Sequence, residues 1–88
     1  MNEQDFLEHT RSLGYGRPQT IELDPMVSGP LHTHEFSVIG LVLSGSVNIA
    51  FEDRSVSNEP GEFCEIPAGV RHDERPGPEG VRVLLVFK

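Results

Sequence analysis

The chain has 88 residues, with 14 acidic and 7 basic side chains that give a formal net charge of −7 at pH 7. This length has room for one domain, and the excess of negative charge argues against nucleic acid or a membrane surface as a partner. No apolar run reaches the roughly 18 residues that span a bilayer, and residues 1–13 lack the basic and apolar regions of a signal peptide. Cys64 is the single cysteine and cannot form an internal disulfide, so we expect a cytoplasmic protein.

Nine glycines and seven prolines, together with apolar residues in strand-length runs, predict a turn-rich all-β fold. Residues 3–13 are the exception: Phe6, Leu7 and Leu13 fall near one face and Gly14 follows as a stop signal, which predicts a short helix. We expect residues 1–18 to form this helix and a linker at residues 15–18, and residues 19–88 to form the β domain.

About seven short strands are predicted, separated by turns every 8–12 residues, and this spacing is typical of a sandwich or a barrel. The turn signals include Ser28-Gly29-Pro30, Ser44-Gly45 and Pro76-Gly77-Pro78. The predicted strands are residues 20–23, 31–43, 47–51, 54–57, 63–66, 71–75 and 81–87.

Two histidines, His32 and His34, lie two residues apart in a predicted strand and therefore share one face. Two neutral imidazoles on one face can bind the same metal ion. Such a pair also occurs on polar strand edges that bind no metal, so by itself it leaves metal binding open. The remaining histidine near a strand is His72, whereas His9 stands alone on the predicted helix and is interpreted as a surface residue.

A second cluster has the spacing Gly-x5-Pro-x-Gly-x2-His at Gly61, Pro67, Gly69 and His72. Each residue has a mechanical reason for its position. Gly61 follows a turn and begins a strand, Pro67 and Gly69 form a sharp corner, and His72 emerges on the returning strand.

These residues resemble the two motifs of the cupin superfamily. His32, His34 and Gly45 match the first motif, Gly-x5-His-x-His-x3-4-Glu-x6-Gly, and the second cluster matches Gly-x5-Pro-x-Gly-x2-His-x3-Asn. The resemblance extends over residues 21–87, and the short N-terminal helix and the stretch from His72 to Val81 also resemble a subgroup of small single-domain cupins. It implies a conical β-barrel (a double-stranded β-helix, or jelly roll) behind a short N-terminal helix, with the three histidines around a divalent transition metal at the barrel mouth.

Three positions depart from the cupin motifs. Met26 replaces the first glycine and Pro76 the final asparagine, and both changes are interpreted as altered loops. Val38 occupies the position of the glutamate ligand, which leaves either a working three-histidine site or a site that is losing its metal. Glu74 has the same parity as His72 on its predicted strand. It is therefore a candidate fourth ligand, or an acceptor that orients a histidine, unless it is solvated at the strand end.

The parity that points the histidines inward also points Phe36, Val38 and Gly40 into the predicted pocket. The opposite row of the same strand is equally apolar, so we expect the N-terminal helix or a second subunit to cover it. A chain this short buries a marginal core of its own. A homodimer is therefore predicted.

Two classes of function remain open at this point. One is a metal-dependent enzyme of the dioxygenase or isomerase type, acting on a small anionic molecule, with Fe, Zn, Ni or Mn held by His32, His34 and His72. The other is a module that binds or senses a metal or a small ligand without catalysis. The fold hosts both classes, and the sequence names neither the substrate nor the metal.

Overall fold

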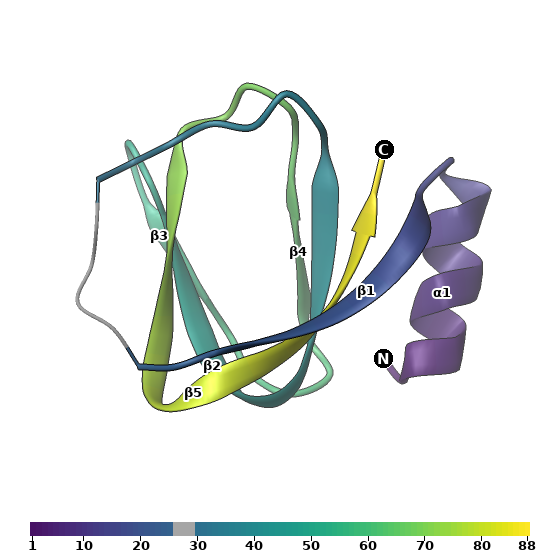
Figure 1. Cartoon of the computed structure of the whole chain (residues 1–88), viewed down its shortest axis with the longest axis horizontal. Coiled ribbons are helices and arrows are strands. Elements are labelled where there is room, and N and C mark those ends of the chain that lie inside the picture. The colour runs from purple at the N-terminus through teal and green to yellow at the C-terminus, as the bar shows by residue number, and fades with distance from the viewer. Residues whose placement is uncertain (26–29) are drawn as a thin grey trace.

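The N-terminal helix precedes the sheet and lies outside it (Figure 1). The computed structural model describes residues 1–25 and 30–88. Helix α1 spans Glu3–Ser12, one residue shorter than predicted. The side chain of Asn2 caps it by accepting a hydrogen bond from the Asp5 N–H at 2.8 Å, which satisfies one of the free donors of the first turn. Two acidic residues in that turn also favour the positive end of the helix dipole.

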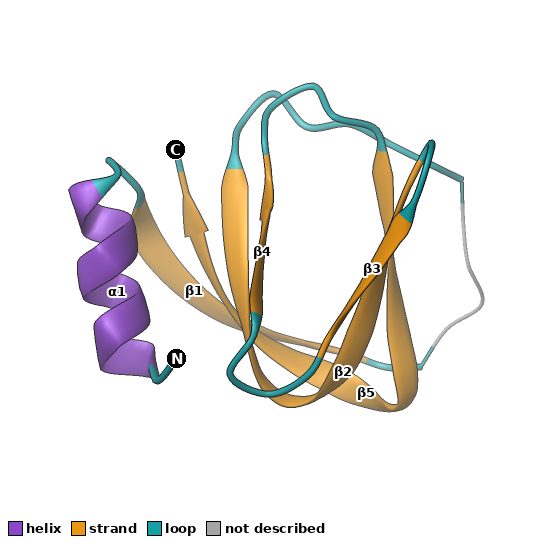
Figure 2. Cartoon of the chain, turned by 180° about the vertical axis from the view of Figure 1, so that it is seen from behind, coloured by secondary structure: helices purple, strands orange, loops and turns teal. Residues whose placement is uncertain are grey.

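Five strands form one antiparallel sheet within the described residues, in the order β1-β5-β2-β3, with β4 paired to the other end of β2. Figures 1 and 2 show the sheet curving round into a barrel. The prediction of an all-β barrel with a short N-terminal helix is therefore confirmed, although the number of strands is not. The strands are β1 (Gly16–Leu23), β2 (Val38–Phe51), β3 (Ser55–Asn58), β4 (Phe63–Ile66) and β5 (His72–Phe87).

Two of the predicted turns are wrong, because β2 and β5 continue through them as long, bent strands. At Ser44-Gly45 the chain makes a bulge: the register of β2 on β5 shifts on either side of Ser44 and Gly45. Gly45 has a φ of +75°, and a Cβ there would overlap the carbonyl oxygen of Gly80. The glycine thus permits a close approach of two strands rather than a chain reversal.

The linker predicted at residues 15–18 is also corrected, because β1 already begins at Gly16 and pairs with Phe87 at the end of β5. A register irregularity between Gly16 and Gln19 marks this start, and Arg17 within it has a φ of +54°. Gly16 and Pro18 lie in this irregular segment at the edge of the sheet.

The strand predicted over residues 31–43 begins later, at Val38. Before it, His32 forms an isolated bridge to His72, while residues 35 and 36 lie in a bend. The motif position Met26 and the predicted turn residues Ser28 and Gly29 lie outside the described residues.

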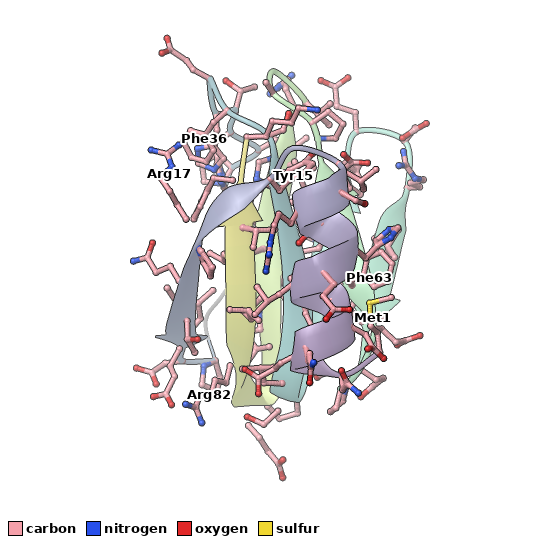
Figure 3. The ribbon with its side chains drawn as sticks, turned by 90° about the vertical axis from the view of Figure 1, so that its right-hand side faces the viewer. Met1, Tyr15, Arg17, Phe36, Phe63 and Arg82 are labelled. Atoms are coloured by element: carbon pink, nitrogen blue, oxygen red, sulfur yellow. The ribbon has the colours of Figure 1, made fainter. Side chains whose placement is uncertain are left out.

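Alternate residues of β2 and β5 face two separate apolar clusters, as the strand period requires. One cluster fills the barrel and contains Val38, Val42, Val47, Ile49, Ile66, Val81 and Val83. The other lies between α1 and the outside of the sheet and contains Phe6, Tyr15, Ile39, Leu41, Leu84 and Val86. Figure 3 looks at this side, with α1 in front of the sheet. The helix therefore covers the outer apolar row of β2. The sequence had left either the helix or a second subunit to cover that row.

Candidate metal centre

Backbone hydrogen bonds bring the two histidine-bearing segments together. The N–H of His32 donates to the carbonyl oxygen of His72 at 2.8 Å, and the N–H of His72 donates back to His32 at 2.9 Å. Two residues farther along, the N–H of Gly69 donates to the carbonyl oxygen of His34 at 2.9 Å. The corner from Pro67 to Gly69, with Gly69 at a φ of +81°, turns the chain so that these pairs can form. The two motifs are thus joined directly through their main chains.

Four side chains converge where these segments meet: His32, His34, His72 and Glu74. One ligand atom from each lies within 4.8 Å of all the others. The ring centroids of the three histidines are 4.6–5.1 Å apart, and the ring of His34 stacks on Phe36 at 4.9 Å. His72 is fully buried, whereas the other three side chains are partly exposed. Val38, at the motif position of the missing carboxylate, belongs to the barrel core.

The outer ring nitrogens of two of these histidines face backbone carbonyls. Nδ1 of His72 lies 2.9 Å from the carbonyl oxygen of Val70, and Nδ1 of His32 lies 3.5 Å from that of Pro30. A carbonyl oxygen can only accept, so Nδ1 of His72 carries the proton, and the more distant contact favours the same tautomer in His32. Nε2 of each ring then points into the cluster, which is the orientation that a metal-binding histidine needs.

The carboxylate of Glu74 contacts Nε2 of both of these histidines. Its Oε1 is 3.1 Å from Nε2 of His72, and its Oε2 is 3.3 Å from Nε2 of His32. A carboxylate oxygen and an unprotonated imidazole nitrogen are both acceptors, so they approach this closely only with a cation between them. That cation is either a proton on Nε2 or a metal ion.

The distances suit a metal ion. Two ligand atoms about 2.1 Å from one ion lie roughly 3.0 Å apart at a right angle and roughly 3.4 Å apart at the tetrahedral angle. The two contacts of Glu74, 3.1 and 3.3 Å, fall within that interval. Three imidazoles and one carboxylate are also a donor set typical of divalent transition metals. The donor set of the four side chains and the two contacts of Glu74 therefore fit such an ion.

A cavity of about 350 Å³ extends from this cluster into the barrel. Phe36, Val38 and Gly40 line it, together with other residues that are mostly apolar. The few polar groups are His32, His34 and Glu74 at the cluster, and Asn58 and Cys64 elsewhere on the wall. A mostly apolar wall with a few polar groups is the usual composition of a small-molecule site.

Two polar residues of the cavity wall have different characters. Cys64 lies opposite Gly40 on β4, and burial raises the pKa of its thiol, so it is protonated and unreactive at neutral pH. Asn58 ends β3, whereas the predicted strand stops at residue 57. Its pairing with the core residue Val47 places it on the inner face, a signal that depends on strand register and therefore was not available in the sequence.

Comparison with protein families gives one assignment: the Cupin domain family matches residues 19–87. A search of curated proteins finds no match. No helix among the described residues is long and apolar enough to cross a membrane.

Solved structures of the same fold are similar to the chain at low sequence identity. KdgF from Halomonas sp. superposes with a TM-score of 0.69 and 22% identity over 80% of this chain and 64% of that one. The EutQ protein of Clostridium difficile gives 0.69 and 24% over 80% of this chain and 53% of its own. A cupin-2 domain protein from Shewanella frigidimarina gives 0.66 and 20% over 91% and 89%. The chain thus spans about half to two thirds of the length of the first two proteins, and these likenesses establish the fold alone.

Proposed function

The chain belongs to the cupin family, and on that premise we propose that it binds a divalent transition metal and holds a small anionic molecule in the cavity beneath it. The metal ligands would be His32, His34, His72 and Glu74. The observation that carries this proposal is the carboxylate of Glu74 facing Nε2 of two imidazoles whose outer nitrogens face carbonyls.

Charge at the site favours an anionic ligand. Three neutral imidazoles and one carboxylate offset one of the two charges of a divalent ion, so a net charge of about +1 would remain beside an apolar cavity. A carboxylate, thiolate or enolate gains more from that field than a neutral molecule does, because the surrounding wall screens it poorly. Four protein ligands also leave two positions of an octahedral ion free for such a molecule or for water.

We propose that the protein is a metal-dependent enzyme with an activity of the dioxygenase or isomerase type. A bound ion would supply Lewis acidity or activate oxygen, while the apolar wall excludes bulk water from the bound molecule. The second candidate, a binding or sensing module, is favoured by a different observation. Outside the four-residue cluster, the only titratable side chain on the described cavity wall is Cys64, whose raised pKa makes it a poor general base.

Metal content tests the proposed site. We expect the wild-type protein, purified without chelators, to hold close to one equivalent of a transition metal by elemental analysis. His34→Ala removes a partly exposed ligand and is expected to lose most of that metal while keeping its circular dichroism spectrum. Glu74→Gln keeps the shape but removes the charge, and we expect its affinity for the metal to fall about 10- to 100-fold.

The matched control is His9→Ala, because His9 is an exposed histidine of α1 outside the cluster. It should bind as much metal as the wild type. Metal that remains in His34→Ala, or that is absent from the wild type even after incubation with Fe, Zn, Ni or Mn, would contradict the proposed centre.

The choice between enzyme and binding module needs a separate measurement. Oxygen uptake by the Fe(II)-loaded protein across thiols, diketones and hydroxy acids is expected to reveal turnover if oxygen is a substrate, and product analysis without oxygen covers isomerisation. A protein that binds metal and ligands but converts none of them is a binding module.

The homodimer and the cytoplasmic location stay predictions. Because α1 covers the outer apolar row of β2, that row no longer argues for a second subunit. What supports association is the apolar surface that remains: Phe63 and Met1 are each more than 40% exposed, and both lie beside α1 in Figure 3.

A further inference from the structure

Asn58 is a buried polar residue on the wall of the cavity. It is only 5% exposed and lines the cavity together with the metal cluster. Among the described residues, no hydrogen bond joins its side-chain amide to another protein group. In the described part of the chain, every side-chain nitrogen or oxygen that is fully buried has a hydrogen-bond partner. The unpaired amide of Asn58 is therefore not fully buried, and it retains contact with the cavity that Asn58 lines.

An amide in this position is unfavourable for folding. Burying an amide without a protein partner costs free energy that a leucine of similar size would not cost. The residues around Asn58 indicate that an apolar side chain would suit this position. Val47 is opposite Asn58, and Ile49 is opposite Val56. Both of these partners belong to the barrel core. The cavity has room for water to solvate the amide, and water of that kind is what a ligand displaces.

The strand register places Asn58 away from the metal cluster. Along β2, Phe51 is beside His72, Ile49 is beside Glu74, and Val47 is beside Asn58. Asn58 therefore lies about two residues, or ~7 Å, farther along the barrel than Glu74, and two strand spacings, ~10 Å, across the sheet. Between them the cavity wall is apolar.

We propose that Asn58 determines ligand specificity by hydrogen-bonding the far end of the bound molecule. This inference rests on the metal and cavity function proposed above and narrows its substrate class. The ligand has an anionic head that reaches the metal, an apolar body of about five to seven carbons, and a hydroxyl, carbonyl or amide at the other end. The amide of Asn58 can serve all three, because it both donates and accepts.

Matched pairs of simple acids test this. Isothermal titration calorimetry on the Ni(II)-loaded protein would compare hexanoate, heptanoate and octanoate with their ω-hydroxy forms. We expect the wild type to bind at least one ω-hydroxy acid more tightly than its alkyl partner, by about five- to tenfold. Asn58→Leu should reverse that preference, because the hydroxyl would then be buried without a partner.

A second readout separates this role from a structural one. Asn58→Leu is expected to raise the midpoint of thermal unfolding of the metal-free protein, since an unpaired buried amide is replaced by an apolar side chain. The control is Asn48→Leu, because Asn48 is on the neighbouring strand and its Nδ2 donates to Oγ of Ser57 at 3.0 Å. That variant should lose stability and keep the wild-type ligand preference.

The outcomes that overturn the inference are distinct from those that overturn the proposed function. If the wild type binds both members of every pair equally, or if Asn58→Leu is destabilised and keeps the preference for the hydroxyl, Asn58 is structural and only this inference fails. If the Ni(II)-loaded wild type binds none of the acids, the proposed anionic ligand fails and the inference fails with it.

Discussion

At the scale of single residues, Tyr15 shows how one side chain links the helix to the barrel. Its ring belongs to the apolar cluster under α1, and its hydroxyl donates to Oε2 of Glu65 on β4 at 2.6 Å. Burial is the first cause that raises the pKa of Tyr15, and the hydrogen bond and the negative charge of Glu65 raise it further. The folded protein therefore holds the phenolic proton more tightly than the unfolded chain does.

This raised pKa predicts a loss of stability in alkali. The contribution of Tyr15 is complete below its unfolded pKa of about 10 and is lost as pH rises through the higher folded value. We expect the free energy of unfolding, measured with urea from pH 8 to pH 11, to fall less steeply in Tyr15→Phe than in the wild type.

The chain suits this measurement because Tyr15 is its only tyrosine, so phenolate absorbance follows one group. Both proteins should carry Cys64→Ala, since the pKa of that thiol is raised as well. Phenolate that forms near pH 10 in the folded protein, or parallel stability curves, would show that Glu65 and burial do not hold the proton.

The candidate ligands were predictable from the sequence because their placement depends on local parity. His72 and Glu74 are two residues apart in a strand that is regular between them, so they point the same way. The reasoning for His32 and His34 was less sound, since neither lies in a named strand; backbone pairing with His72 and Gly69 aligns them instead. Asn58 could not be recognised, because its inward orientation follows from its partner across the sheet.

At the scale of elements, the long strands β2 and β5 are where sequence signals misled. Ser44-Gly45 and Pro76-Gly77-Pro78 are ordinary turn signals, yet both lie inside strands. The prolines are tolerated because β1 pairs with β5 only from Val81 onward, so that the earlier part of β5 has a free edge among the described strands. Glycine suits position 77, because a Cβ there would overlap Oγ of Ser46.

Alanine substitutions at three glycines test the bulge. Gly45→Ala combines a positive φ with a backbone overlap, and we expect it to lower the free energy of unfolding by more than about 2 kcal/mol. Gly69→Ala has the positive φ but open space around its Cβ, so it should cost about 1 kcal/mol. Gly16→Ala has neither feature and should be close to neutral.

Urea unfolding of the three variants gives these values directly. Equal losses for Gly45→Ala and Gly69→Ala would mean that the strands can separate at the bulge without cost, and that backbone conformation alone accounts for the glycine.

At the scale of the whole molecule, the fold encloses a cavity of about 350 Å³ within only 88 residues. A small domain with a cavity in its core has little apolar packing to stabilise it. Ligand binding to the folded state is then the means by which its free energy of unfolding can rise. A metal ion that binds only the folded state, present at a free concentration 1,000 times its Kd, adds about 4 kcal/mol to the free energy of unfolding.

We therefore expect saturation with metal to raise the thermal midpoint by roughly 10 °C or more, and a chelator to reverse the change. Differential scanning calorimetry of the apo and metal-loaded protein measures this. The same metal should leave the midpoint of His34→Ala almost unchanged, and an equal rise in that variant would indicate binding elsewhere on the chain.

The pairing of β5 with two different neighbours divides the molecule unevenly. Within residues 1–25 and 30–88, its second half lies between β1 and β2 and is backed by α1, whereas its first half, with His72 and Glu74, has β2 alongside and one bridge to His32. Among these described contacts, fewer hold the first half than the second, so we expect the first half to open at a lower free energy than the whole domain unfolds. We therefore expect the end of the barrel that carries the candidate ligands to open locally more often than the helix-backed end.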